Sequence, residues 1–134
     1  MTRKGCDSGF FLLMGVGHAS ARQVWQDAVA GQHELVMSTL SVNEVLVAYY
    51  RQGKSQEAAD FLTLIQSAPW LRIVPTSLDI VQRSAGYRHG LGLPTVDSVI
   101  LATAVMEGCD ELLTTDSHFL IAMTQGVIAV TVLS

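Results

Sequence analysis

The segment from residue 96 to residue 106 constrains the fold more than any other part of the sequence. It reads Val-Asp-Ser-Val-Ile-Leu-Ala-Thr-Ala-Val-Met, and it is almost wholly apolar after Asp97. A helix that is apolar around its whole circumference must be covered by other elements. Gly108 provides a stop for this helix, and residues 111–114 predict a short strand with Asp116 just beyond it. The sequence therefore predicts a buried helix and a strand that each carry a carboxylate at one end.

Asp97 admits two interpretations. In the first, Thr95 or Asp97 caps the helix or favours its N-terminus through the helix dipole. In the second, Asp97 belongs to a metal site. The positions of the other acids in the chain decide between the two.

The rest of the chain alternates between expected strands and expected helices. Strands are expected over residues 1–6, 35–37, 71–74, 111–114 and 127–133, and helices over residues 10–14, 18–30, 42–51, 55–66, 77–89, 96–106 and 117–123. This alternation predicts the α/β class, as a three-layer sandwich with a central, mainly parallel sheet of four to five strands and helices on both faces. No linker or repeat divides residues 1–134, so we expect a single domain. Residues 1–6 are the poorest strand, because Arg3, Lys4 and Gly5 are weak strand formers.

Composition limits the class of protein. The chain has 134 residues, of which 49% are hydrophobic and 15% charged, which is typical of a compact globular domain. No apolar run is long enough to cross a bilayer, and the residues after Arg3 and Lys4 do not form a signal peptide. We therefore expect a cytoplasmic protein with no membrane segment. The four histidines are scattered, and no zinc motif is present.

The net charge of −4 argues against nucleic-acid binding by electrostatics alone. The argument weakens if a cation gathers four of the twelve acids in one site, because the rest of the chain then carries no net charge. Most of the basic side chains are expected to be ordinary surface charges. The candidates for contacts with an RNA backbone are Arg3, Lys4, Arg22, Arg51, Lys54 and Arg88.

Four acids fall at the carboxyl ends of expected strands or on helices that begin there, which is where ligands gather in parallel sheets. They are Asp7, Glu44 (expected in the first turn of its helix), Asp97 and Asp116. Each has an ordinary explanation as a turn residue or a helix-dipole partner. Together, four converging carboxylates would raise one another's pKa unless a cation were present. Carboxylate oxygens suit Mg²⁺ or Mn²⁺. The other eight acids are expected on the solvated surface.

The chain resembles the PIN (PilT N-terminus) domain family, and within it the single-domain VapC-type toxins of bacteria. The resemblance rests on Asp7-Ser8, Asn43-Glu44-Val45, the run from Asp97 to Ala104, and the run from Leu113 to Phe119. It implies an endoribonuclease that binds Mg²⁺ or Mn²⁺ through Asp7, Glu44, Asp97 and Asp116. The nucleophile would be a metal-activated water, and the hydroxyl groups of Ser8 and Thr115 would support the site or a phosphate. The implied partners are an RNA substrate, a cognate antitoxin and a second copy of the chain.

Two further expectations follow from the resemblance. His118 occupies a position where many relatives carry another acid, so the resemblance does not imply that this position helps to bind a second metal ion. Cys6 would lie at the carboxyl end of its strand and Cys109 before the amino end of a neighbouring strand, so both thiols should be free.

Two other functions share some of these features. A PIN-like module that binds RNA or protein without cleaving it is the main alternative, although the presence of all four acids counts against it. A phospho-receiver domain also places acids around Mg²⁺, but it needs a lysine late in the chain, and the only lysines are Lys4 and Lys54. Self-association is also expected, with Tyr49, Tyr50, Trp70 and Leu91 as candidate interface residues.

Overall fold

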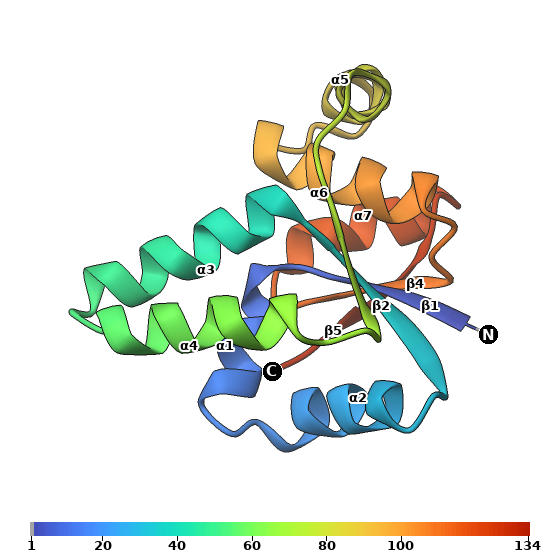
Figure 1. Cartoon of the computed structure of the whole chain (residues 1–134). Coiled ribbons are helices and arrows are strands. Elements are labelled where there is room, and N and C mark those ends of the chain that lie inside the picture. The colour runs from blue at the N-terminus through green and yellow to red at the C-terminus, as the bar shows by residue number, and fades with distance from the viewer. Residues whose placement is uncertain (1) are drawn as a thin grey trace.

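The computed structural model describes residues 2–134 and forms a three-layer α/β sandwich (Figure 1). Five parallel strands make one sheet in the order β3-β2-β1-β4-β5. This confirms the predicted fold class. The strands are β1 (Thr2–Cys6), β2 (His33–Ser38), β3 (Leu71–Val74), β4 (Glu111–Thr114) and β5 (Ala129–Val132). The helices are α1 (Ser8–Gly15), α2 (Ala19–Val29), α3 (Thr39–Arg51), α4 (Ser55–Gln66), α5 (Leu78–Leu91), α6 (Thr95–Met106), the short 3₁₀ helix η1 (Ser117–Phe119) and α7 (Leu120–Thr124).

The two faces of the sheet are covered by different helices, because successive side chains of a strand point to opposite faces. Leu35 and Met37 of β2 pack with side chains of α1, α3 and α4 in one buried cluster. Val36, which lies between them in sequence, packs with α5 and α6 on the other face. The same alternation separates Leu113 from Leu112 in β4.

Helix α6 is the buried helix that its sequence predicts. Its residues from Ser98 to Ala104 are all buried, and it lies between the sheet and α5 (Figure 1). Among residues 2–134, no single helix is long and apolar enough to cross a bilayer. Helices α5 and α6 reach that length and hydropathy only as a pair, with a 118° bend between them.

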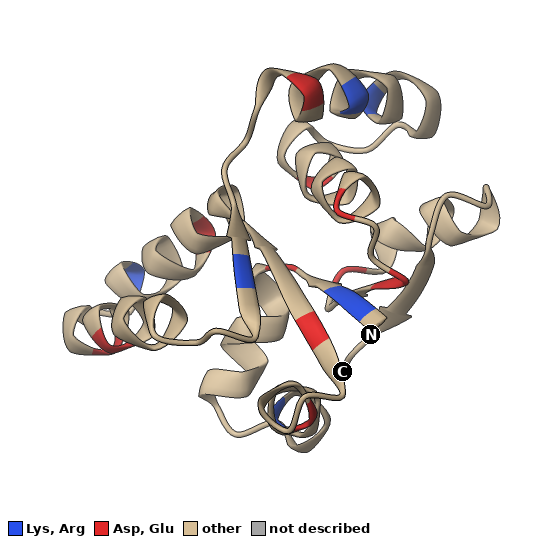
Figure 2. Ribbon diagram, turned by 45° about the vertical axis from the view of Figure 1, so that its right-hand side comes forward, with Lys and Arg blue, Asp and Glu red and all other residues tan. Residues whose placement is uncertain are grey.

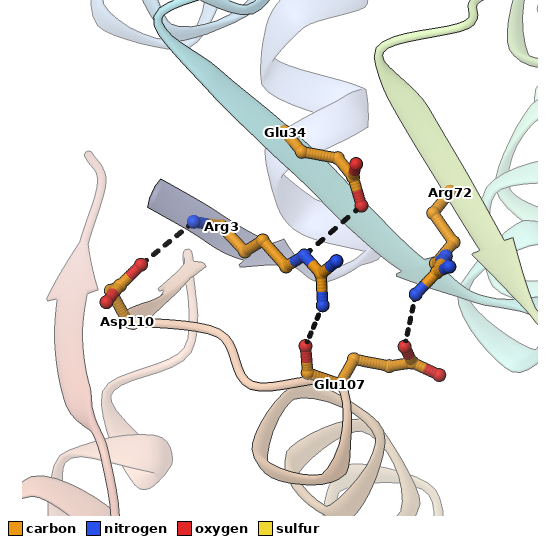
Figure 3. Close-up of polar contacts among 5 residues, drawn as sticks. All are labelled: Arg3, Glu34, Arg72, Glu107 and Asp110. Carbon is orange, nitrogen blue, oxygen red and sulfur yellow. Dashed lines mark hydrogen bonds and ion pairs between the residues drawn. The ribbon is translucent and has the colours of Figure 1, made fainter. Parts of the chain in front are cut away.

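The poorest predicted strand, β1, is the central strand of the sheet. Arg3 is held at its amino end by contacts with residues far along the chain (Figure 3). Its backbone N–H donates to Asp110 (2.8 Å), its guanidinium donates to the carbonyl oxygen of Glu107 (2.9 Å), and its Nε lies 3.4 Å from Glu34. Lys4 pairs with Glu111 at 2.8 Å. Arg72 of β3, Glu34 of β2 and Arg3 of β1 form a row of basic, acidic and basic positions across the sheet (Figure 2). Long-range contacts therefore compensate for the weak strand propensity of β1.

These contacts revise the list of candidate RNA-binding side chains. Arg3 and Lys4 are engaged in ion pairs at the amino end of β1, which is the end opposite Asp7. They are therefore poorly placed to contact an RNA backbone at the predicted acids.

Gly5 allows α6 to lie close against β1. A Cβ added at Gly5 would lie 2.8 Å from the Cβ of Ala104, which is closer than side-chain packing allows. The glycine that weakens β1 as a strand is thus needed for packing. Cys6 and Cys109 are both free, as predicted.

Several element boundaries differ from the predicted ones. Helix α3 begins at Thr39 with Ser38 as its N-cap, three residues before the predicted start, so Glu44 lies in the second turn and not in the first. Strand β5 is shorter than predicted, and α5 continues to Leu91, where Gly92 in the left-handed conformation ends it.

Candidate metal centre

The candidate site lies where the direction of the chain through the sheet reverses. From β1 the chain moves outward through β2 to β3, and it later returns to β4 on the other side of β1. Ligands of open parallel sheets bind at the carboxyl ends of the strands that flank such a switch point. Asp7 directly follows β1, and Asp116 follows β4 by two residues. The sheet therefore brings together two acids that are far apart in the sequence.

Asp7 is the most firmly held of the four predicted acids, with 5% of its surface exposed. One carboxylate oxygen accepts the backbone N–H of Phe10 at 3.0 Å, which makes Asp7 the N-cap of α1. The other accepts a hydrogen bond from the hydroxyl of Thr114. Burial raises the pKa of Asp7, the hydrogen bonds from Thr114 and Phe10 lower it, and the negative charge of Asp116 raises it, so that the pKa is raised on balance.

Glu44 reaches the site from the second turn of α3. Its pKa is raised, mainly by burial and further by the negative charges of Asp97 and Asp7. A hydrogen bond from Ser8 acts in the opposite direction. Ser8 thus lies close to Glu44, and the supporting role that the resemblance implies for its hydroxyl stays a prediction.

Asp97 lies in the first turn of α6, but its side chain does not cap the helix. Pro94 is the N-cap residue, and no side-chain cap hydrogen bond is formed. The interpretation of Asp97 or Thr95 as a capping side chain is therefore wrong, although an acid in the first turn still favours the helix dipole. Burial raises the pKa of Asp97, and the charges of Asp116 and Asp7 raise it further, while His118 lowers it.

Asp116 is the N-cap residue of η1, two residues after β4, and is held by its immediate neighbours. Its carboxylate accepts the backbone N–H of His118 at 2.9 Å and lies 3.1 Å from the Nδ1 of the same residue. Its own backbone N–H donates to the Thr114 hydroxyl at 2.9 Å. Thr115 packs its side chain against Gly9 of α1, and its backbone N–H donates to Asp7. The contact of Thr115 with the site therefore runs through its backbone.

The electrostatics of this group differ from those of an ordinary acid on the same sheet. Burial acts to raise the pKa of Glu111, but hydrogen bonds from Lys4 and Thr131 outweigh it and lower the pKa. For Asp7, Glu44 and Asp97, neighbouring carboxylates instead add to the effect of burial. Within residues 2–134, neither lysine nor arginine forms an ion pair with any of the four acids. The group therefore has an excess of negative charge that a divalent cation would neutralise.

The side chains are not arranged as finished metal ligands. Among residues 2–134, no three His, Cys, Asp or Glu side chains converge closely enough to hold an ion together. Two of the four carboxylates are engaged by protein donors, Asp7 by Phe10 and Thr114 and Asp116 by His118. The donor chemistry nevertheless fits Mg²⁺ or Mn²⁺, which prefer carboxylate oxygens.

Thr114 is the site residue that sequence reasoning missed. It is fully buried at the end of β4, and its hydroxyl joins Asp7 to the backbone of Asp116. A threonine as the last residue of an apolar strand, two positions before a candidate acid, was the available indication. Threonine is a common strand residue, however, and its partner Asp7 is 107 positions away.

Replacing Thr114 with valine should weaken the site without changing the shape of the core. Valine keeps the volume but removes the donor to Asp7 and the acceptor for the Asp116 N–H. We expect a loss of about 1–3 kcal/mol in the free energy of unfolding and a decrease of about 10–100-fold in divalent-metal affinity. Urea denaturation and calorimetric Mn²⁺ titration measure the two effects. Thr114→Ser keeps the hydroxyl and should retain most of the metal affinity; equal affinities for the valine and serine variants would contradict this role.

The raised carboxylate pKa values predict an unusual pH dependence. A group whose pKa is higher in the folded state binds protons more tightly there, so its contribution to stability decreases as pH rises from about 4 through the raised pKa. Asp97→Asn should therefore stabilise the metal-free protein at pH 7, and this advantage should shrink toward pH 4. Urea denaturation in EDTA at low salt, from pH 4 to 7, tests it. An advantage that is constant with pH would show that Asp97 does not carry this electrostatic cost.

Comparisons with known proteins place the fold. A family model described as PIN domain matches residues 6–122. No curated protein sequence matches the chain. A toxin–antitoxin complex from Klebsiella pneumoniae contains a chain of 24% identity, with a TM-score of 0.71 over 96% of this chain and 95% of that one. VapBC2 from Rickettsia felis, bound to a DNA fragment from its promoter, gives 13% identity and a TM-score of 0.77 over 99% and 100%. VapC20 from Mycobacterium tuberculosis is a toxin that cleaves the sarcin–ricin loop. It has 18% identity and a TM-score of 0.73, over 89% of this chain and 94% of that one.

Proposed function

Because the chain belongs to the PIN domain family, we propose that it is a metal-dependent endoribonuclease that acts in the cytoplasm as the toxin of a type II toxin–antitoxin pair. One observation carries the proposal: Asp7 and Asp116 flank the switch point of the sheet, and Glu44 and Asp97 lie close enough to them that the charge of Asp7 raises the pKa of both. An excess of negative charge at this position suits a cation that in turn binds phosphate.

Mg²⁺ or Mn²⁺ would be held by Asp7, Glu44, Asp97 and Asp116. When bound, such an ion lowers the pKa of a water and stabilises the leaving oxygen of a phosphodiester. The protein supplies orientation, since Thr114 donates a hydrogen bond to Asp7. His118, whose side chain is 76% exposed beside Asp116, is placed to contact a substrate phosphate.

The proposed partners are an RNA substrate, a cognate antitoxin and a second copy of the chain. The antitoxin is supported by the fold shared with chains of toxin–antitoxin complexes. Self-association is supported by large apolar side chains on the surface. Of the candidate interface residues, Tyr50 is 57% exposed, whereas Tyr49, Trp70 and Leu91 pack against the buried clusters.

Cleavage of RNA should require a divalent metal. We expect purified protein, freed of any antitoxin, to cut single-stranded or structured RNA in Mn²⁺ or Mg²⁺ and to lose at least about 100-fold of its rate in EDTA, since the metal's neutralisation of phosphate charge is lost. Gel analysis of tRNA, rRNA and mRNA tests this, and activity should return when Mn²⁺ is added back. Equal cleavage with and without chelator would refute a metal-dependent site.

The second candidate function is a non-catalytic module that binds RNA or protein. It is favoured by one observation, that the four acids do not form a ready set of ligands. If the protein binds RNA but cleaves neither tRNA, rRNA nor mRNA in Mn²⁺, this alternative is selected.

A further inference from the structure

A cavity of about 320 Å³ opens beside the candidate metal centre. It is lined by Leu91, Gly92, Leu93, Pro94, His118 and Ile121. Two of these lining residues adjoin candidate acids. Pro94 is the N-cap of the helix that carries Asp97, and His118 pairs with Asp116. These two residues are thus next to candidate acids, although none of the four acids lines the cavity itself.

We infer that this cavity binds one unstacked nucleobase of a single-stranded RNA, next to the scissile phosphate. The inference rests on the proposed function, because that function supplies RNA as the ligand. Four of the six lining residues, the two leucines, Pro94 and Ile121, are apolar, and His118 adds an imidazole ring that can lie against a base. Sequence-specific RNA recognition uses bases that are splayed out of the strand in this way. The volume lies at the lower end of the range for small-ligand sites, roughly 300–1,000 Å³.

The charges around the cavity favour a nucleotide over an apolar peptide side chain. Arg88 and His89 lie in the last turn of α5, directly before the lining residues, and both are exposed. Within residues 2–134, Arg88 forms no ion pair. A nucleotide has an apolar base and an anionic phosphate, so it matches an apolar cavity whose first lining residue, Leu91, follows the Arg88 guanidinium by three residues along α5.

Filling the cavity separates base recognition from catalysis. Ile121 is 38% exposed on α7, so Ile121→Trp can occupy the cavity without disturbing the core. Met123→Trp is the matched control, because Met123 is 46% exposed on the same helix and does not line the cavity. Each protein is incubated in Mn²⁺ with an RNA pool that is randomised around one cleavage site. The cleavage products are then sequenced.

We expect Ile121→Trp to lower cleavage at the preferred nucleotide by about tenfold or more, in the range that loss of one base contact causes. Cleavage at other nucleotides should change little, and Met123→Trp should keep the wild-type preference.

Arg88→Gln should instead lower cleavage uniformly at all nucleotides. It should also reduce the slope of log binding constant against log salt concentration by about 0.7, the value for one phosphate of a single strand. Arg83→Gln, on the same helix but lining a different cavity, should leave the slope unchanged.

A second readout does not depend on cleavage. RNA containing 4-thiouridine is cross-linked to the Asp97→Asn protein, and the attachment site is mapped by mass spectrometry. Cross-links to residues 91–94 or to Ile121 support the inference, even if the wild-type protein cleaves nothing and the proposed function fails. The inference is overturned by cross-links elsewhere only, by no cross-link at all, or by an unchanged nucleotide preference in Ile121→Trp. A variant that loses antitoxin binding alone would assign the cavity to a peptide.

Discussion

Asp97→Asn should abolish RNA cleavage while leaving the protein folded and somewhat more stable. The substitution removes one charge from a group of carboxylates that repel one another, and it removes a candidate metal ligand at the start of the buried helix α6. We expect the cleavage rate in Mn²⁺ to fall by more than about 100-fold, beyond the 10–100-fold usual for residues that only orient ligands. Without metal, the melting temperature at pH 7 should rise by about 2–8 °C for each kcal/mol of repulsion relieved.

The control is an acid on the same domain that the structure places outside the site. Asp79 lies in the first turn of α5, and Asp79→Asn should cleave RNA at the wild-type rate. Added Mn²⁺ should raise the melting temperature of the wild type and of Asp79→Asn, but not that of Asp97→Asn. Wild-type cleavage by Asp97→Asn would contradict the proposed site, whatever its effect on stability.

Gly9→Ala should damage stability and activity together. Gly9 lies in the first turn of α1, two residues after Asp7, and an added Cβ would overlap the hydroxyl of Thr115 and lie 3.0 Å from the Thr115 Cβ. Alanine gains at most about 1 kcal/mol in helix propensity, whereas overpacking costs about 1–3 kcal/mol. We expect net destabilisation by about 1–2 kcal/mol in urea. The cleavage rate should fall at least tenfold, because a displacement of about 1 Å can cost 100-fold.

Two matched variants separate the clash from other effects of alanine. Gly86 lies within α5 and has no atom within 4 Å of an added Cβ, so Gly86→Ala should stabilise the protein by about 0.5–1 kcal/mol. Thr115→Ala removes the overlapping hydroxyl, so it should recover part of the stability lost in Gly9→Ala. If the two substitutions are additive, the clash is not the cause.

The fold was predictable because local patterns agree with it. Helix α6 is apolar all round and is buried, and α4 and β4 have the predicted boundaries. Errors occurred at ends, where side-chain caps override periodicity: Ser38 starts α3 early, and Gly92 ends α5 late. The central place of β1 was not predictable, because Arg3 is held by residues more than 100 positions away.

The positions of the candidate acids in the fold were predictable from the sequence, but their hydrogen bonding was not. Acids that follow parallel strands lie at the same edge of the sheet, so Asp7 and Asp116 could be assigned to that edge from the expected parallel strands alone. The contact of Thr114 with Asp7 could not be predicted, because its hydroxyl acts only through the register of β1 with β4. The direct pairing of His118 with Asp116 likewise depends on the local backbone of η1.

The central position of β1 has a consequence for the order of folding. Strand β1 precedes its partner β4 by more than 100 residues, so that Arg3 contacts Asp110 and Asp7 contacts Thr114, each 107 residues later. Contacts of such long sequence separation slow folding, because the chain loses conformational entropy in closing the loop before the contacts can stabilise it. A nascent chain that has exposed only β1, β2 and β3 therefore holds Asp7 and Glu44 without Asp97 or Asp116. The proposed nuclease site cannot assemble until β4 and the loop after it have also left the ribosome.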